Sequence, residues 1–228
     1  MQRLSDIKRV QQLFNIKKTQ LEMVRDRGYD IGDEAQILQM SLENFIQYVT
    51  QITIQHKTSP RAALSRSYLT REDVPGPKRS MIVYYGGKTN PQQKQVPAEI
   101  VREFIALIQK YGVTEAILIV DAPLSSSGNL ELTALVSVKW QIFDDTNLTY
   151  NPIKHVDVPL HELLSKEEAD AKIREMKTSY SQVLIMSAKD PVARYYGWTP
   201  GSLIRIHRDD SAVSILSPKS VNYRYIHG

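Results

Sequence analysis

Two histidines flank an aspartate in the segment HVDVPLH, where a metal ion could be held. His155, Asp157 and His161 offer two imidazoles and a carboxylate, which are ligands that zinc accepts. Pro159 prevents the helical register that would bring the three side chains together, and no fourth ligand lies nearby in the sequence. We therefore interpret the histidines as hydrogen-bonding residues of the fold and expect no metal site.

Asp121 follows a short apolar run, at the end of a predicted buried strand, where α/β folds often place a catalytic carboxylate. The same position suits an aspartate that caps a loop. A metal-dependent nuclease would need a second carboxylate and a lysine on the neighbouring strand, but Ser137 stands where the acid before Lys139 is required. The nearest acids have the wrong spacing: Glu131, Asp144 and Asp145. We predict no catalytic residues, and a nuclease is the alternative.

Residues 55–80 carry the whole excess of positive charge. Six basic residues face two acidic ones there, which equals the net charge of +4 for the chain. Prolines and a glycine in the same stretch predict a basic loop that approaches a polyanion, or else a solvated loop that binds nothing. The candidates for proximity to DNA in this loop are Lys57, Arg61 and Arg66.

The composition limits the remaining chemistry. The chain has 228 residues, of which 42% are hydrophobic, so it can bury a core as one large or two small domains. The absence of cysteine excludes disulfides, thiolate metal sites and a cysteine nucleophile. The scattered glycines form no phosphate-binding motif, so we expect no cofactor. Without a long apolar run or a signal peptide, we expect a soluble, unexported protein that has no membrane partner.

The first part of the chain predicts an α/β domain. Amphipathic helices are expected from Ser5 to Gly28 and from Ser41 onwards. A strand at 81–85, a helix that begins at Pro97 and a buried strand at 115–120 then form a parallel crossover. The first part of the segment from 129 to 150 fits a helix or a strand and is left open, whereas WQIF and LTY look extended.

A boundary near residue 153 separates this domain, residues 1–152, from a small α+β module, residues 153–228. Ser165 caps a helix with Glu168 at the capping-box position, and Asp190-Pro191 begins another. Strands are expected at LIRI and at NYRYI.

The module also carries a resemblance to a known family. The run from Asp190 to Gly197, then Pro200-Gly201 and LIRIHR, resembles the fifth-largest subunit shared by eukaryotic nuclear RNA polymerases. The tail of that protein corresponds to a small subunit of the archaeal RNA polymerase. The segments HVDVPLHELLSKEEADAKI, NYRYI and, near the amino terminus, KKTQLEMVRDRGYDI are similar to the same family, so the likeness spans nearly the whole chain.

The resemblance implies a non-catalytic, structural subunit of a multisubunit DNA-dependent RNA polymerase. The first domain would form part of the lower jaw beside downstream duplex DNA, on a nuclease-like fold without nuclease chemistry, and the module would anchor to the largest subunit. The compartment would be the nucleus, or a virion or cytoplasmic viral factory for a large DNA virus. The residues in matching motifs, expected in docking or in the fold, are Asp190, Pro191, Arg194, Tyr195, Gly197, Arg205, Tyr223 and Arg224.

At two places the sequence departs from the family pattern, and there the family's contacts do not transfer directly to this chain. A tip that faces the duplex in the family reads here as Leu124, Ser125, Ser126 and Ser127. Serine hydroxyls and backbone N–H groups can bond phosphates, so the three serines are DNA-proximal candidates, although the tip also fits a plain turn. The family's Arg-Ser-x-Thr-Ala-Gly loop is replaced at 208–212. A free-standing nucleic-acid-binding adaptor is the third possible function.

Overall fold

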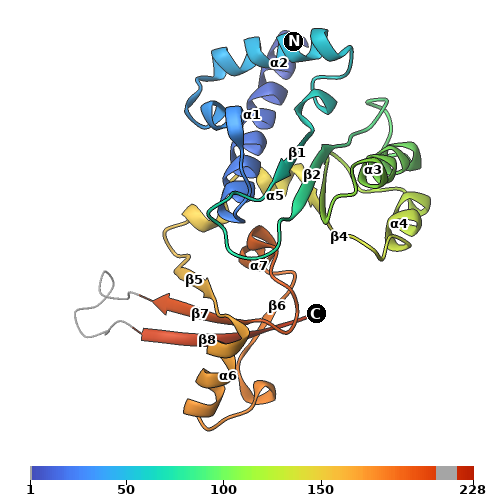
Figure 1. The fold of residues 1–228 in the computed structure, drawn as a ribbon. Helices are drawn as coiled ribbons and strands as arrows, with labels where there is room; N and C mark the ends of the chain where they lie inside the picture. Colours follow the sequence, from blue (N-terminus) through green and yellow to red (C-terminus); the bar gives the residue numbers. More distant parts are fainter. Residues whose placement is uncertain (1, 209–219) are drawn as a thin grey trace. The chain divides into compact units, whose positions relative to one another are not determined.

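The structure is a computed structural model that describes residues 2–208 and 220–228 (Figure 1). Its contacts divide the chain into two compact units, Met1–Tyr150 and Asn151–Gly228, which we call the N-terminal and C-terminal units. Each unit mixes helices with its own four-stranded mixed sheet. Most of the divergent loop at 208–212 lies outside the described residues.

The N-terminal unit contains seven helical segments and four strands. The helices are α1 (Gln2–Asp26), η1 (Gly32–Gln39), α2 (Leu42–His56), η2 (Ala62–Leu64), α3 (Ala98–Tyr111), α4 (Ser126–Thr133) and α5 (Asp145–Leu148). The strands are β1 (Arg66–Leu69), β2 (Ser80–Tyr85), β3 (Glu115–Val120) and β4 (Lys139–Asp144).

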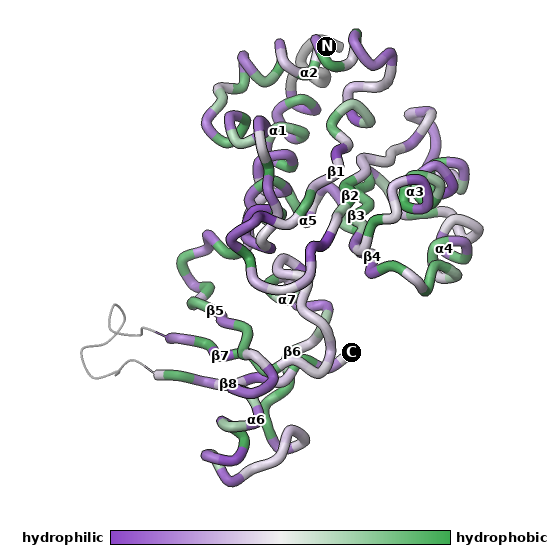
Figure 2. Tube along the Cα trace, in the orientation of Figure 1, coloured by the Kyte–Doolittle hydropathy of each residue, from purple (hydrophilic) through white to green (hydrophobic). Residues whose placement is uncertain are grey.

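The sheet of this unit has the order β1-β2-β3-β4, with β2, β3 and β4 parallel and β1 antiparallel to β2. Figure 1 shows α3 and α4 on one side of the sheet and α1 on the other. On the first side, Leu118 belongs to the same core cluster as Phe104 of α3 and Leu132 of α4. Because helices cover both faces, every residue of β3 is buried. Figure 2 shows hydrophobic residues concentrated in the strands at the centre of this sheet.

Three local expectations for this unit are wrong. Residues 55–80 are not one loop, because they contain η2 and the edge strand β1, whose short pattern is hidden among charged residues. Helix α1 begins at Gln2, before the expected cap at Ser5. Leu148 ends α5 instead of being extended, since Asp144 and Asn147 form a capping box. The segment left open becomes α4, which Ser125 caps by accepting a hydrogen bond from the Gly128 N–H.

In its described residues, 151–208 and 220–228, the C-terminal unit contains four helical segments and four strands. The helices are η3 (Pro152–Lys154), α6 (Lys166–Glu175), η4 (Tyr180–Gln182) and α7 (Pro191–Tyr196). The strands are β5 (Leu160–Leu163), β6 (Ile185–Ser187), β7 (Leu203–Arg208) and β8 (Ser220–His227).

The sheet of this unit has the order β5-β7-β8-β6 and separates two small cores. In one cluster Ile204 and Ile226 pack with Val192 of α7. In the other, Leu203 packs with Ala169 and Ile173 of α6. The central strands β7 and β8 therefore contribute to both cores, and the fold of the unit depends on them.

Candidate functional sites

Arg61 lies at the carboxyl edge of the parallel strands, where open α/β sheets usually bind their ligands. Its guanidinium donates to both carboxylate oxygens of Asp145, at 2.8 and 2.7 Å, and its Nε donates to the Gly86 carbonyl. The side chains of Arg61 and Asp145 are 15% and 14% exposed. This bidentate pair ties the segment before β1 to the ends of β2 and β4.

Gly87 allows this arrangement. A Cβ built on Gly87 would lie 3.0 Å from Arg61 Cδ and 3.5 Å from Asp121 Cγ, so a larger residue would displace the arginine stem. Asp121 itself accepts a hydrogen bond of 3.0 Å from the Lys88 N–H. Asp121 therefore caps the loop after β2, which is one of the two roles considered for it.

The three DNA-proximal candidates from residues 55–80 differ in their surroundings. Lys57 is exposed and ends α2 in the left-handed conformation, with φ of 50°. Arg61 is held by Asp145, and Arg66 donates to the carbonyls of Ala63 and Ser65 at 2.9 and 2.8 Å. Of these three residues only Lys57 is exposed, so Arg61 and Arg66 have structural partners that the sequence did not indicate.

Ser125, Ser126 and Ser127 start α4 instead of forming a plain turn. Ser126 and Ser127 are exposed, and the Ser125 N–H donates to the Val96 carbonyl at 3.0 Å. The bridge between Val96 and Leu124 fixes this start of α4 beside the segment that leads into α3. The structure does not bring the serines together with Lys57 in any described contact.

A buried polar cluster in the N-terminal unit was not predicted from the sequence. Lys17 of α1 has no exposed surface, and its Nζ donates to Glu34 (3.1 Å), the Leu64 carbonyl (3.2 Å) and the Tyr68 hydroxyl (3.2 Å). Burial lowers the pKa of Lys17, while Glu34 opposes that shift, and burial raises the pKa of Tyr68. The available signal was spacing, because Lys17 stands within the apolar stripe that Phe14 and Leu21 share.

In the C-terminal unit, the motif around α7 forms a complete short helix. Asp190 Oδ1 accepts from the Val192 N–H at 2.8 Å, Pro191 occupies the first turn, and Gly197 ends the helix with φ of 68°. Tyr195 is buried, and its hydroxyl accepts from Asn151 Nδ2 at 3.3 Å. Arg194 lies half-buried on the same helix.

The remaining docking candidates lie on β7 and β8. Arg205 donates to Glu162 of β5 at 3.1 Å and lies opposite Tyr223 in the ladder. Arg224 lies opposite Ile204. Because cross-strand partners share a face, Arg205 and Tyr223 belong to one face of the sheet and Arg224 to the other.

The histidines do not form a metal cluster. His155 Nδ1 accepts from the Asp157 N–H at 3.2 Å, and His161 Nδ1 contacts the Pro159 carbonyl at 2.7 Å. Across residues 2–208 and 220–228, no group of three acidic or histidine side chains could hold a metal ion. None of the helices in the described part of the chain is long and apolar enough to cross a membrane.

Comparison with known protein families finds a matching domain model for each of the two units. The model of the RNA polymerase Rpb5 N-terminal domain matches residues 8–106, and that of the RNA polymerase Rpb5 C-terminal domain matches residues 150–226. Together they cover about three quarters of the chain, in the order of the two units. The chain belongs to the Rpb5 family.

Curated relatives of this Rpb5 chain are similar along most of their length. DNA-directed RNA polymerases IV and V subunit 5B of Arabidopsis thaliana is 28% identical over 92% of this chain and 87% of its own. Subunit RPABC1 of DNA-directed RNA polymerases I, II, and III from Caenorhabditis elegans is 25% identical over 94% and 95%. The corresponding protein of Dictyostelium discoideum is 26% identical over 87% and 91%.

The candidate residues differ in whether they lie inside the ranges that the Rpb5 domain models match. Lys57, Arg61 and Arg66 lie inside the N-terminal match, and all of the docking candidates lie inside the C-terminal match. Ser125, Ser126 and Ser127 lie between the two matched ranges. The serines therefore belong to a part of this Rpb5 chain that neither domain model includes.

Proposed function

We propose that this Rpb5 chain is a non-catalytic, structural subunit of a multisubunit DNA-directed RNA polymerase. The observation that carries the proposal is that both Rpb5 domain models match in order, one on each compact unit. The carboxyl edge of the parallel sheet supports the lack of catalysis, because Asp145 is bound by Arg61 and Asp121 caps a loop. A metal-dependent nuclease would need both carboxylates free to hold its ion.

The C-terminal unit is proposed to dock onto the largest polymerase subunit. Its β7 and β8 expose parts of Arg205, Tyr223 and Arg224, while Asp190 and Gly197 shape the helix that packs on the sheet. Under this proposal the residues of α7 stabilise the fold of the unit. The partly exposed residues of the sheet contact the partner subunit directly. Other polymerase subunits are further partners.

The N-terminal unit is proposed to serve as a nuclease-like jaw domain beside downstream duplex DNA. Lys57 supports this through an exposed positive charge, and Ser126 and Ser127 through exposed hydroxyls at the start of α4. Contacts of these kinds bind phosphates and position a duplex without reading its sequence. Arg61 and Arg66 would act on DNA mainly by holding the surface in place.

The test is purification of the tagged full-length chain from the cells that express it, followed by native mass spectrometry. We expect one copy in a complex with the large polymerase subunits. A chain recovered alone, or bound only to nucleic acid, would indicate the free-standing adaptor instead. Cleavage of DNA by the pure chain with magnesium or manganese would indicate the nuclease.

The proposed compartment is the nucleus, because the relatives include subunits of RNA polymerases I, II and III. Fluorescence imaging of the tagged chain should show nuclear signal. Signal confined to virions or to a cytoplasmic viral factory would contradict the nuclear assignment and indicate a viral polymerase.

A further inference from the structure

Strand β5 forms one edge of the C-terminal sheet, and its outer backbone groups have no backbone partner among residues 2–208 and 220–228. The Leu164 N–H donates to the Leu203 carbonyl at 3.1 Å, which makes this a hydrogen-bonded pair of the antiparallel ladder with β7. Since such pairs alternate, Glu162 also bonds β7, whereas the N–H and C=O groups of His161 and Leu163 point outward. No backbone group in the described part of the chain bonds those four outward groups.

The side chains of β5 protect this edge only in part, because Glu162 is the one acidic residue among its four. Natural sheets usually shield an exposed edge with charged residues or proline, because an open edge templates another strand. In β5, by contrast, Leu160 is 66% exposed and Leu163 is 46% exposed. The two leucines lie on opposite faces of the strand, so an added strand would cover apolar surface on both sides.

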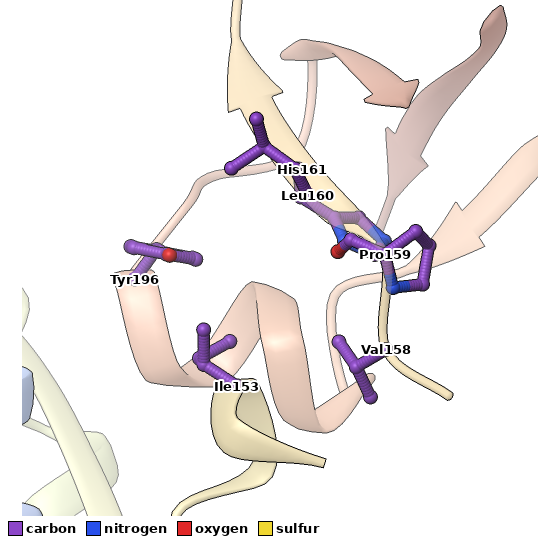
Figure 3. Close-up of a pocket in the computed structure, with 6 residues that line it drawn as sticks. All are labelled: Ile153, Val158, Pro159, Leu160, His161 and Tyr196. Carbon is purple, nitrogen blue, oxygen red and sulfur yellow. The ribbon is translucent and has the colours of Figure 1, made fainter. Parts of the chain in front are cut away.

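A pocket of about 240 Å³ lies beside the start of β5 (Figure 3). It is lined by Ile153, Val158, Pro159, Leu160, His161 and Tyr196. Figure 3 shows Ile153, Val158 and Tyr196 gathered across from the beginning of the strand. The volume is below the range of roughly 300–1,000 Å³ that is usual for small-molecule sites, so the pocket suits a single apolar side chain.

We propose that β5 receives an extended segment of another polymerase subunit by strand addition, with one apolar side chain of that segment in the pocket. This inference rests on the proposed function, and it names the surface and the chemistry of docking. The added segment has apolar residues opposite His161 and Leu163, on the face that carries the pocket. Opposite Glu162, which is 47% exposed, it has a basic or uncharged residue.

Charge argues against a second copy of this chain as the occupant. If the β5 strands of two copies paired antiparallel through the outward N–H and C=O groups of His161 and Leu163, His161 would lie opposite Leu163 of the other copy. Glu162 would then stand directly opposite the same glutamate, and like charges in that position destabilise a sheet. Glu162 already accepts a hydrogen bond from Arg205 of β7, and a different strand with a basic or uncharged residue opposite it would avoid this repulsion.

The test compares tagged full-length variants that are expressed beside the untagged chain. The double substitution Leu160→Lys and Leu163→Lys places two charges on the edge, and His161→Pro removes one outward N–H that the ladder with β7 does not use. Val156→Lys is the matched control, because Val156 is 94% exposed and does not line the pocket. We expect the two edge variants to enter the purified polymerase about tenfold less than the control does, which corresponds to about 1.4 kcal/mol.

A cross-linking measurement tests the edge without weakening it. The chain has no cysteine, so Leu163→Cys provides a single site for a thiol-linked photo-cross-linker. Within the purified polymerase we expect this site to cross-link to one larger subunit, and a label at Val156→Cys not to do so. A cross-link between two copies of the chain would overturn the proposed occupant.

The outcomes separate the two proposals. If the wild-type tagged chain does not enter a polymerase, both the function and the role of β5 are wrong. If the wild-type chain enters it, the edge variants enter equally and Leu163→Cys gives no cross-link to a subunit, only the role of β5 is wrong. Thermal unfolding of the isolated variants establishes whether poor assembly reflects a lost contact or a lost fold.

Discussion

At the scale of single residues, the contacts of Arg61 change its expected role. The sequence placed it in a basic loop that could approach DNA, but its guanidinium is bound by Asp145 and its Nε by the Gly86 carbonyl. A cation that is already paired and mostly buried contributes little to the release of counterions from DNA. Arg61 therefore has a structural role, whereas Lys57 remains available to DNA, although both belong to the same charged stretch.

We expect Arg61→Ala to lower the free energy of unfolding by about 2–4 kcal/mol, because Asp145 would keep its charge at a mostly buried position without its partner. Lys57→Ala should change it by less than about 0.5 kcal/mol, as for other exposed positions. Urea unfolding of the full chain measures both. Equal stability of the two variants would contradict the assignment of Arg61 as a structural clamp.

The exposed charge of Lys57 also predicts an effect on DNA binding. In an assembled polymerase, Lys57→Ala should weaken DNA engagement more at low salt than at high salt and reduce the salt slope by about one. Binding titrations at several salt concentrations measure this slope. An unchanged slope for Lys57→Ala would remove this residue from the proposed DNA surface.

Tyr180 of the C-terminal unit predicts that the stability of the fold decreases at alkaline pH. Tyr180 donates to Asp170 Oδ1 at 2.7 Å, and burial together with this carboxylate raises its pKa to about 12. Because the folded pKa lies above the unfolded value of 10.0, the stabilisation is complete below pH 10 and is lost as the pH rises towards 12. We expect the advantage of the wild-type chain over Tyr180→Phe in unfolding free energy to be larger at pH 9 than at pH 11.5. An advantage that grows with pH would contradict this assignment.

At the scale of elements, the buried cluster around Lys17 joins helices to the sheet. Lys17 comes from α1, Glu34 from η1 and Tyr68 from β1, and Gln20 of α1 links Tyr68 to Tyr85 of β2 by hydrogen bonds. These contacts connect segments up to 65 residues apart in the chain. The cluster thus determines where α1 and η1 pack on the strands.

We expect Glu34→Gln to destabilise the N-terminal unit by about 3–5 kcal/mol, because it leaves the buried Lys17 ammonium without its counter-charge. The double variant Lys17→Met and Glu34→Gln should recover part of that loss. Chemical unfolding of the wild-type chain, the two single variants and the double variant gives the coupling energy. Strictly additive effects would show that the two side chains do not act as a pair.

The strand β5 shows how an element gains a role from its neighbours. Its four residues pair with β7 on one side only, and its leucines stay exposed. The sequence LHEL carries no signal for an edge, because the position of a strand in its sheet depends on pairing with residues more than 40 positions away.

At the scale of the whole molecule, the chain is built as two units with separate cores. Deletion of the tail from Asp190 would remove β7 and β8, the two central strands of the second sheet. Such a deletion abolishes the fold of the C-terminal unit together with any docking. Point variants at the surface are therefore the sharper test of assembly.

Because the two cores are separate, we expect a core substitution in one unit to destabilise mainly that unit. Ile204 is fully buried in the C-terminal unit, and Leu118 is fully buried in the N-terminal unit. We expect Ile204→Ala to cost about 2–5 kcal/mol and to speed backbone hydrogen exchange mainly in residues 151–228. Leu118→Ala should do the same in residues 1–150. Exchange that rises equally in both units for either variant would show that they unfold as one.

The sequence alone determined the longer helices, the strands β2 and β3, and the family. The regular apolar spacing of α1, α2 and α3 was readable because it depends on residues within one or two turns, and α6 was readable from its capping box. The Asp190-Pro191 start and the Gly197 end of α7 were readable because caps are local chemistry. The Rpb5 resemblance followed from motifs that keep their residues in order along the chain.

Only the tertiary structure decided which charged residues are exposed and which are held by partners. Arg61 and Asp145 are 84 positions apart, and Lys17 lies 51 positions from Tyr68, so no local pattern could pair them. The same holds for the free edge of β5 and the pocket beside it. Composition and spacing report local preference, whereas partners, burial and sheet edges arise when distant segments are brought together by the fold.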